Sequence, residues 1–117
     1  MKKVAIIISS TPHGSAKGRE ALDTALALST FNHVSVFFID DGVFHLLANQ
    51  HPELILMRDY IATFNMLELY DIEDVYVSKA SLDKRNLNQT PLNIVNQVID
   101  ENQLTQQLAN QDVVLRF

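Results

Sequence analysis

The chain has 117 residues, of which 47% are hydrophobic, and its formal net charge is −5. This length and composition predict one folded domain over residues 1–117 and exclude a disordered chain, while the acidic balance argues against broad nucleic-acid binding, because phosphate contacts need clustered Lys and Arg. The sequence contains no cysteine, which excludes disulfides, thiolate metal sites and a cysteine nucleophile in this chain.

The first predicted element is a strand at residues 3–9, KVAIIIS. It is continuously apolar and β-branched, as expected for a strand that is covered on both faces. Two lysines before a short apolar run also resemble a signal peptide, but the run is short and Thr11-Pro12-His13-Gly14 makes a poor cleavage site. No apolar run approaches the ~20 residues that a membrane helix needs. We therefore expect a buried first strand and a cytoplasmic protein.

The loop between this strand and a helix at residues 16–29 has the composition of a phosphate-binding loop. It reads SSTPHGSAKGRE over residues 9–20. A Walker A loop needs its lysine after the last glycine, whereas here Lys17 precedes Gly18 and no Ser or Thr follows in the magnesium position. The G-x-G-x-x-G pattern also fails, because Gly14 and Gly18 are four positions apart and the third glycine is missing. A helix N-terminus can hold an anion without a motif, but we favour a structural turn over a nucleotide site.

A second strand is predicted at residues 34–39, followed by an unusually apolar short helix at 43–49. Asp40-Asp41-Gly42 ends the strand and can cap this helix through a carboxylate oxygen. Apolar side chains cover roughly 200° of the helix circumference, whereas a surface helix needs about 100°. The surplus face must be covered either by the helix that follows in the chain or by another subunit. The candidate interface residues on this face are Val43, Phe44, Leu46 and Leu47.

The rest of the chain continues the alternation of helices and strands. Pro52 suits the first turn of a helix whose apolar positions follow helical spacing. The stretch 87–97 is interrupted by Pro91, and Ile94-Val95 could form a short strand within it. The remaining predicted elements are a helix at 52–68, a strand at 74–78, one or two helical turns at 80–86, a helix at 100–110 and a final strand at 112–116.

Strands that alternate with helices predict an α/β fold, because parallel strands need crossover connections that cover the sheet. We expect a three-layer sandwich around a mostly parallel sheet of four to five strands. In such a sheet, ligand sites lie beyond the carboxyl ends of the strands. Residues 10–18, 40–46 and 78–83 should meet at that edge.

The polar residues expected at this edge admit two kinds of chemistry, and we favour neither. A Ser/His/Asp set could be drawn from them, but a hydrolase nucleophile usually stands in a G-x-S-x-G elbow, which is absent. Asp40 and Asp41 with His13 and His45 could hold a divalent metal, but adjacent strand residues point to opposite faces, which favours a cap and a solvated acid. We therefore expect no catalytic residue, no metal and no cofactor. The edge residues are Ser9, Ser10, Thr11, His13, Asp40, Asp41, His45, Ser78, Lys79 and Ser81.

Other polar residues carry weaker signals. His33 lies in a predicted turn and His51 at a predicted helix start, and neither has a partner by spacing. The carboxylates Glu73 and Asp74 are interpreted as a strand boundary rather than an acid–base pair. The basic cluster is interpreted as a solvated face, because it is small and interrupted by an acid; it consists of Lys79, Lys84 and Arg85 around Asp83.

Four segments, in order and over nearly the whole chain, resemble the DsrF-type subunits of the DsrE/DsrF-like family. They read HGSAKGREALDTALA, FFIDDGVFHLL, RDYIATFNMLELYDIEDVYV and LANQDVVLRF. The resemblance implies an α/β fold and a cytoplasmic heterohexamer with two copies of each of three related subunits. The partners that it implies are TusB-like and TusD-like sister subunits, and a downstream sulfur-carrier protein is a further candidate. The implied function is relay of persulfide sulfur toward 2-thiouridine at the tRNA wobble position.

In the family, the sulfur-carrying cysteine belongs to the TusD-like sister, near the end of the strand that corresponds to residues 75–78 here. This sequence has Ser78 in that region. A hydroxyl is far less acidic than a thiol and does not hold sulfane sulfur, so a non-catalytic, scaffolding subunit is expected. The alternative is a stand-alone protein that binds a small ligand or anion through residues 10–18, and a Ser hydrolase is a third hypothesis.

Overall fold

A computed structural model describes residues 2–11, 16–46, 72, 74–87 and 97–117. Five strands form one sheet in the order β4-β3-β2-β1-β5, and every neighbouring pair is parallel. The predicted α/β fold with a parallel sheet is therefore confirmed, with five strands. The strands are β1 Lys3–Ile8, β2 His33–Phe38, β3 Asp74–Ser78, β4 Gln97–Ile99 and β5 Val113–Arg116.

The central strands are the most apolar ones in the sequence. β1 aligns with β2 from Lys3↔His33 to Ile8↔Phe38, and after its first residue each of these strands is buried throughout. Two-sided burial explains the continuous apolar runs, because helices cover both faces of a parallel sheet. The edge strand β5 is instead largely exposed, with Val113 and Val114 at 37% and 48%.

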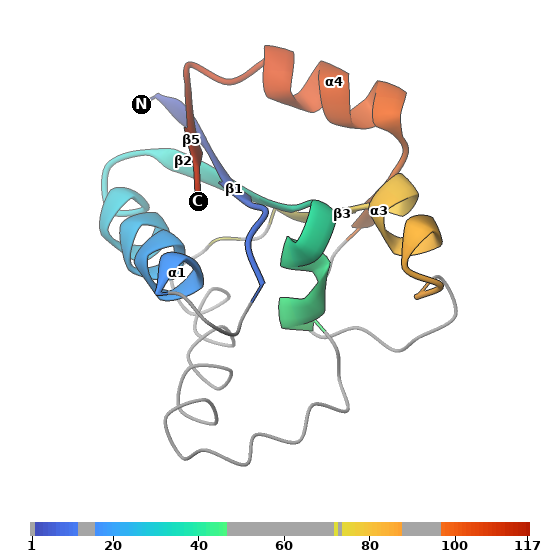
Figure 1. Cartoon of the computed structure of the whole chain (residues 1–117). Coiled ribbons are helices and arrows are strands. Elements are labelled where there is room, and N and C mark those ends of the chain that lie inside the picture. The colour runs from blue at the N-terminus through green and yellow to red at the C-terminus, as the bar shows by residue number, and fades with distance from the viewer. Residues whose placement is uncertain (1, 12–15, 47–71, 73, 88–96) are drawn as a thin grey trace.

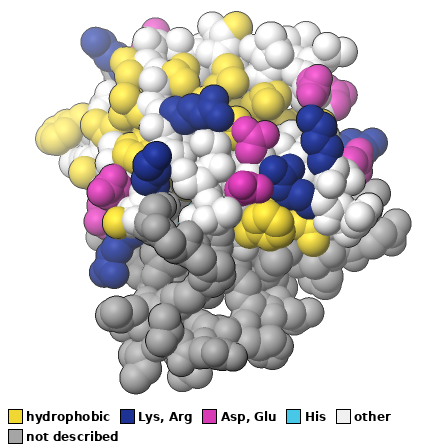
Figure 2. Space-filling view, viewed as in Figure 1, with side chains coloured by type: hydrophobic (Ala, Val, Ile, Leu, Met, Phe, Trp, Pro, Cys, Tyr) yellow, Lys and Arg dark blue, Asp and Glu magenta, His cyan; other side chains and the backbone are white. Residues whose placement is uncertain are grey.

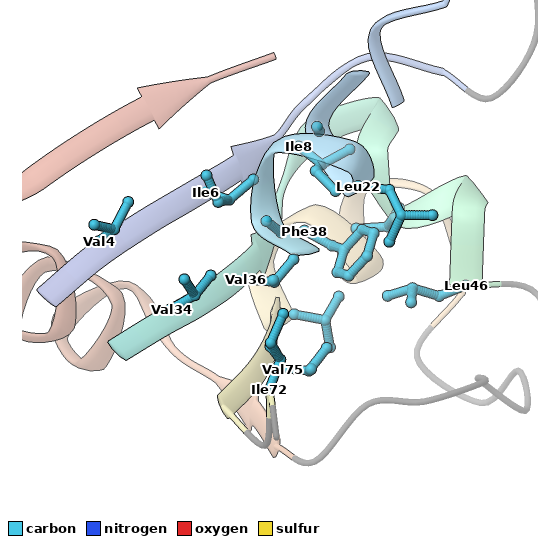
Figure 3. Packing of buried hydrophobic residues seen from close by; sticks show 14 of the residues in the cluster. Val4, Ile6, Ile8, Leu22, Val34, Val36, Phe38, Leu46, Ile72 and Val75 are labelled. Carbon is cyan, nitrogen blue, oxygen red and sulfur yellow. The ribbon is translucent and has the colours of Figure 1, made fainter. Parts of the chain in front are cut away.

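The alternating side chains of the strands build two hydrophobic clusters, one on each face of the sheet. The larger cluster contains Ile6, Val36 and Phe38 together with Leu22 (Figure 3). The smaller one contains Ala5, Ile7, Phe37 and Ile99, against which Leu104 and Leu108 pack.

Helices therefore lie on both sides of the sheet, as the three-layer prediction required. α1, Lys17–Leu28, lies on one side, and α4, Glu101–Ala109, lies on the other (Figure 1). α4 begins with a capping box, in which Asp100 Oδ1 accepts from the N–H of Gln103 and Gln103 Oε1 accepts from the N–H of Asp100. These reciprocal bonds satisfy two backbone donors and fix the start of the helix.

A 3₁₀-helix, η1 at Asp40–Leu46, follows β2 directly. The prediction that Asp40 and Asp41 cap a helix that starts at residue 43 is wrong, because both residues lie inside the 3₁₀-helix and their carboxylates pair with arginines. Gly42 makes this early turn possible: a Cβ at this position would lie 1.9 Å from the carbonyl oxygen of Ile8. The chain can approach β1 this closely only without a side chain.

The predicted turns at 80–86 and the predicted helix at 100–110 correspond to α3, Lys79–Lys84, and to α4. β4 at Gln97–Ile99 was not predicted. Several predictions fall on residues that lie outside the described part of the chain. They concern the helix at 52–68, the strand at Ile94-Val95, residues 12–15 of the loop before the first helix, and Leu47.

Candidate functional site

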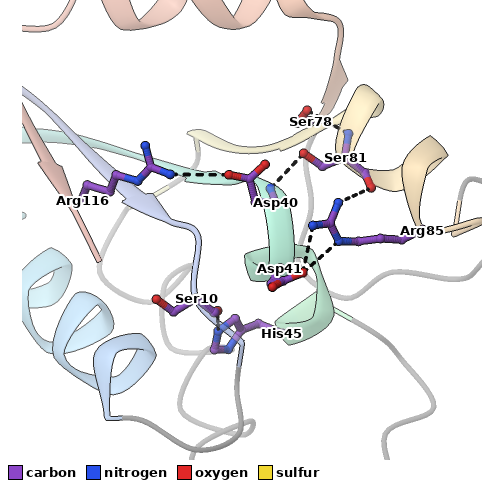
Figure 4. Close-up of polar contacts among 8 residues, drawn as sticks. All are labelled: Ser10, Asp40, Asp41, His45, Ser78, Ser81, Arg85 and Arg116. Atoms are coloured by element: carbon purple, nitrogen blue, oxygen red, sulfur yellow. Dashed lines mark hydrogen bonds and ion pairs between the residues drawn. The ribbon is translucent and has the colours of Figure 1, made fainter.

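Polar side chains from four elements meet beyond the carboxyl ends of the strands (Figure 4). They come from the segment after β1, from η1, from the start of α3 and from the end of β5. Of the three segments predicted to meet at this edge, residues 40–46 and 78–83 are joined by the contacts below, and Ser10 of the segment 10–18 contacts His45, while residues 12–15 lie outside the described part of the chain. The residues are Ser9, Ser10, Asp40, Asp41, His45, Ser78, Ser81, Arg85 and Arg116.

Ser78 is the N-cap of α3 and is only 5% exposed. Its Oγ accepts a hydrogen bond from the N–H of Ser81 at 3.2 Å, and the Ser81 hydroxyl in turn accepts from the N–H of Asp40 at 2.9 Å. Both hydroxyl groups therefore satisfy backbone donors where the chain turns sharply. This geometry agrees with the interpretation of these serines as caps rather than nucleophiles.

The two aspartates at this edge are each paired with a different arginine. Asp41 Oδ1 accepts from Arg85 Nη2 at 2.8 Å and from Arg85 Nε at 3.2 Å, and the Arg85 guanidinium lies 6.0 Å from the centre of the Phe44 ring. Asp40 Oδ2 lies 3.5 Å from Nη2 of Arg116. The carboxylates are thus drawn apart, and the described residues contain no group of three acidic or histidine side chains that could hold a metal ion.

Arg85 contradicts the interpretation of the basic cluster as only a solvated face. Its guanidinium also donates from Nη1 to the carbonyl oxygen of Ser81 at 3.2 Å, so this side chain connects α3 to η1. Because the partner Asp41 lies 44 positions earlier, the sequence spacing gave no signal for the pair.

His45 is buried and directed toward the backbone. Its Nε2 lies 2.8 Å from the carbonyl oxygen of Ser10, and since a carbonyl only accepts, Nε2 carries the proton and donates. This nitrogen is therefore engaged with the backbone rather than with a serine hydroxyl. His13, the other histidine of the hypothetical metal and hydrolase sites, lies outside the described residues.

At the amino ends of the strands, opposite the site, His33 has a partner that the sequence did not reveal. Its Nε2 lies 2.6 Å from Asp74 Oδ2. The two residues start neighbouring parallel strands, in which Ser35 is aligned with Asp74. Only the strand order brings these two side chains together, and the sequence does not specify that order.

The four candidate interface residues do not share one environment. Val43 and Leu46 are completely buried in the larger hydrophobic cluster of the chain itself, so their apolar character is explained without another subunit. Phe44 is partly exposed beside Arg85. Leu47 lies outside the described residues. The predicted surface is thereby reduced, among the described residues, to Phe44.

Tyr76 packs against the smaller hydrophobic cluster. Tyr76 stacks on Phe37 with 5.1 Å between the ring centres. Burial, and secondarily the carboxylate of Asp74, raise the pKa of Tyr76 above its ordinary value of 10.0. The phenol is therefore neutral at physiological pH, and its ring packs, partly buried, against the smaller cluster. Within the described part of the chain, no helix is long and apolar enough to cross a membrane.

Comparison with known proteins places these features in context. Residues 2–117 match the model of the DsrE/DsrF-like family. The chain is 50% identical over 119 aligned residues to Protein TusC of Escherichia coli O157:H7 and to Protein TusC of Shigella flexneri, and each alignment covers 100% of both chains. Among solved structures, the ychN protein from E. coli is similar with a TM-score of 0.81 and 25% identity, and the match covers 100% of both chains.

Proposed function

Because this chain belongs to the DsrE/DsrF-like family and is a full-length homologue of TusC, we propose that it is a non-catalytic subunit of a TusBCD-like sulfur-transfer complex. The complex relays persulfide sulfur for 2-thiouridine formation at the tRNA wobble position. The observation that carries the proposal is the 50% identity to TusC, which extends over 100% of both chains. Such coverage leaves no part of the relative unmatched.

The chemistry of the chain supports a role without sulfur transfer of its own. A persulfide carrier needs a thiolate, and the sequence contains no cysteine. At the end of β3, the Ser78 hydroxyl is buried and accepts the N–H of Ser81 at 3.2 Å. In this position it stabilises the start of α3 and offers no reactive atom.

The role that remains is to hold sister subunits in place. We propose TusB-like and TusD-like chains as the partners, in a cytoplasmic heterohexamer with two copies of each subunit. A downstream sulfur carrier would then meet the cysteine of the TusD-like sister. The acidic net charge of −5 supports a function that involves no direct contact with tRNA.

Coexpression with the two sister subunits tests the proposal. We expect this chain to co-purify with both, and the mass of the intact complex to equal two copies of each of three subunits. The control is the chain expressed alone and run on the same size-exclusion column. If its mobility and mass are the same with and without the sisters, the proposal is wrong, and binding of a small ligand through residues 10–18 becomes the better hypothesis.

A further inference from the structure

The β5 edge of the sheet carries exposed apolar side chains. β5 is the last strand in the order β4-β3-β2-β1-β5, so one side of its backbone faces away from the sheet. Val113 and Val114 are 37% and 48% exposed. Figure 2 shows hydrophobic side chains at the surface around the position that β5 has in Figure 1, with basic side chains beside them. An open, apolar strand edge is a template for pairing with another strand.

The direction of the backbone groups defines which residues can pair. Phe117 directly follows β5; its N–H donates to the carbonyl oxygen of Ile7 at 2.8 Å and its carbonyl oxygen accepts from the N–H of Ser9 at 2.9 Å, so both groups point toward β1. Along a strand the direction of these groups alternates. The N–H and C=O of Val113 and Leu115 therefore also point toward β1, whereas those of Val114 point to the open edge.

The side chains of residues 112–116, DVVLR, form a self-complementary pattern. Asp112 and Arg116 carry opposite charges at the two ends, and Val114 lies at the centre between them. When two such segments run antiparallel, Asp112 of each lies opposite Arg116 of the other, and Val113 lies opposite Leu115. A parallel arrangement would place like charges opposite each other, which is unfavourable.

We propose that β5 pairs antiparallel with β5 of a second copy of this chain, with Val114 facing its counterpart across a twofold axis. The reciprocal backbone bonds then join the two Val114 residues, whose N–H and C=O groups point outward. The Val114 pair is a hydrogen-bonded pair, with about 5.5 Å between the two Cα atoms. A contact of this kind is isologous and closed, so it ends at a dimer.

The charged residues at the ends can make these new contacts without unfolding the chain. Asp112 Oδ2 accepts the N–H of Lys3 at 2.8 Å, and its second oxygen can accept from an arginine. Arg116 is 61% exposed, and its contact with Asp40 Oδ2 is long at 3.5 Å. Its Nε also donates to Ser9 Oγ at 3.2 Å. The partner Asp112 therefore competes with one hydrogen bond and one weak, solvated ion pair.

The other edge of the sheet lacks this pattern and provides a matched control. β4 is only three residues long, Gln97–Ile99, and carries no charge. Its exposed residue Val98 has almost the same exposure as Val114, 47% against 48%. A difference in cross-linking rate between these two positions therefore reflects the geometry of the contact and not the accessibility of the side chain. The proposed contact is independent of the sulfur-relay role, because it involves only this chain.

Engineered disulfides test the contact, and the absence of natural cysteine makes the result specific to the introduced thiol. The full-length chain is prepared as V114C and as V98C and oxidised mildly at equal concentration. We expect V114C to form a covalent dimer about tenfold faster than V98C, because the Cα atoms of a hydrogen-bonded pair are about 5.5 Å apart, which is within disulfide reach. Equal rates, or a faster V98C, would overturn the proposal.

Charge reversal then tests the antiparallel register. In the V114C background, D112R makes both ends of the segment basic and R116D makes both ends acidic, so neither should pair with itself. We expect each variant alone to cross-link about tenfold more slowly than V114C, and an equal mixture to recover the V114C rate as a mixed dimer. Thermal melting of each variant verifies the fold. Variants that cross-link alone as fast as V114C, or a mixture that stays slow, would contradict the register and the proposal.

Discussion

The hydroxyl of Ser81 accepts a hydrogen bond from the backbone N–H of Asp40 at 2.9 Å. Asp40 begins η1 in the left-handed region, with φ at 48°, and Ser81 lies in the first turn of α3. The Ser81 N–H donates to Ser78 at 3.2 Å. Ser81 thus joins η1 to the start of α3 at the carboxyl ends of the strands.

We expect Ser81→Ala to lower the free energy of unfolding by about 1–2 kcal/mol. The substitution leaves the partly buried N–H of Asp40 without its acceptor, and an unsatisfied donor of this kind is destabilising. Urea denaturation measures the change. The control is Thr105→Ala on the exposed face of α4, where the hydroxyl only bonds back to the carbonyl oxygen of Glu101. An equal effect of the two substitutions would show that the Ser81 contact is not special.

We expect Gly42→Ala to be the more damaging change, with a loss of about 3 kcal/mol. The new Cβ would lie 1.9 Å from the Ile8 carbonyl oxygen, which is backbone and already accepts from Ile39 N–H at 3.1 Å. Relief requires η1 to move away from β1, which opens packed core. The same denaturation experiment on Asp41→Ala, an exposed ion-pair residue next to it, should show a change below about 1 kcal/mol. A mild effect of Gly42→Ala would mean that η1 does not approach β1 this closely.

The raised pKa of Tyr76 predicts how stability changes at alkaline pH. In the unfolded chain this phenol ionises near 10.0, whereas in the folded chain burial and then Asp74 raise its pKa. The stabilising contribution is therefore complete below pH 10 and is lost as the pH rises through the higher pKa of the folded state. Tyr76→Phe should flatten this alkaline loss, as measured by thermal melting between pH 9 and pH 11.

A spectroscopic measurement checks the same pKa directly. The chain has three tyrosines, so the phenolate absorbance of the parent minus that of Tyr76→Phe isolates this residue. Asp74→Asn should lower the midpoint toward 10.0 by removing the nearby negative charge. A midpoint at or below 10.0 in the parent would show that partial burial and Asp74 do not raise this pKa.

The sequence was sufficient to predict the strands of the sheet centre and the helices that cover it. Strands that are buried on both faces have continuous apolar sequences, such as residues 3–9 and 34–39. The parallel pairing of these two strands is confirmed. β4 was missed because it is three residues long at the sheet edge, and only Ile99 of it is buried. A strand this short carries no periodicity that could separate it from a loop.

The site was harder to predict because its contacts join distant parts of the chain. Asp41 pairs with Arg85 and His33 with Asp74 across more than 40 positions, and only the strand order brings them together. The apolar face at residues 43–46 was predicted to meet another element, but its most apolar members fill the core beneath it. Helical projection assumes one helix type and one buried stripe, whereas a 3₁₀-helix that turns onto β1 buries other positions.

Phe44 is the residue through which the remaining interface prediction can be tested. We expect Phe44→Glu to weaken assembly with the sister subunits about tenfold or more while the fold persists. Arg85, whose guanidinium lies 6.0 Å from the ring, can pair with the new carboxylate in the free chain, whereas burial of that charge at a contact is unfavourable. Affinity is measured by titration of the sisters.

The matched control is Phe31→Glu. Phe31 lies just before β2, at the amino ends of the strands, and its ring is 79% exposed. This variant should assemble with the affinity of the parent chain. If Phe44→Glu also assembles normally, Phe44 has no role at a subunit contact.

Transfer of labelled sulfur through the reconstituted complex tests the central claim most directly. The donor, both sister subunits and the acceptor are combined with and without this chain, and label is followed on each polypeptide. We predict no label on this chain, because its sulfur atoms are the thioethers of three methionines, which do not form persulfides. We also predict loss of transfer when the chain is omitted, because a carrier cysteine needs a fixed environment to remain reactive. Label on this chain, or full transfer in its absence, would contradict the account.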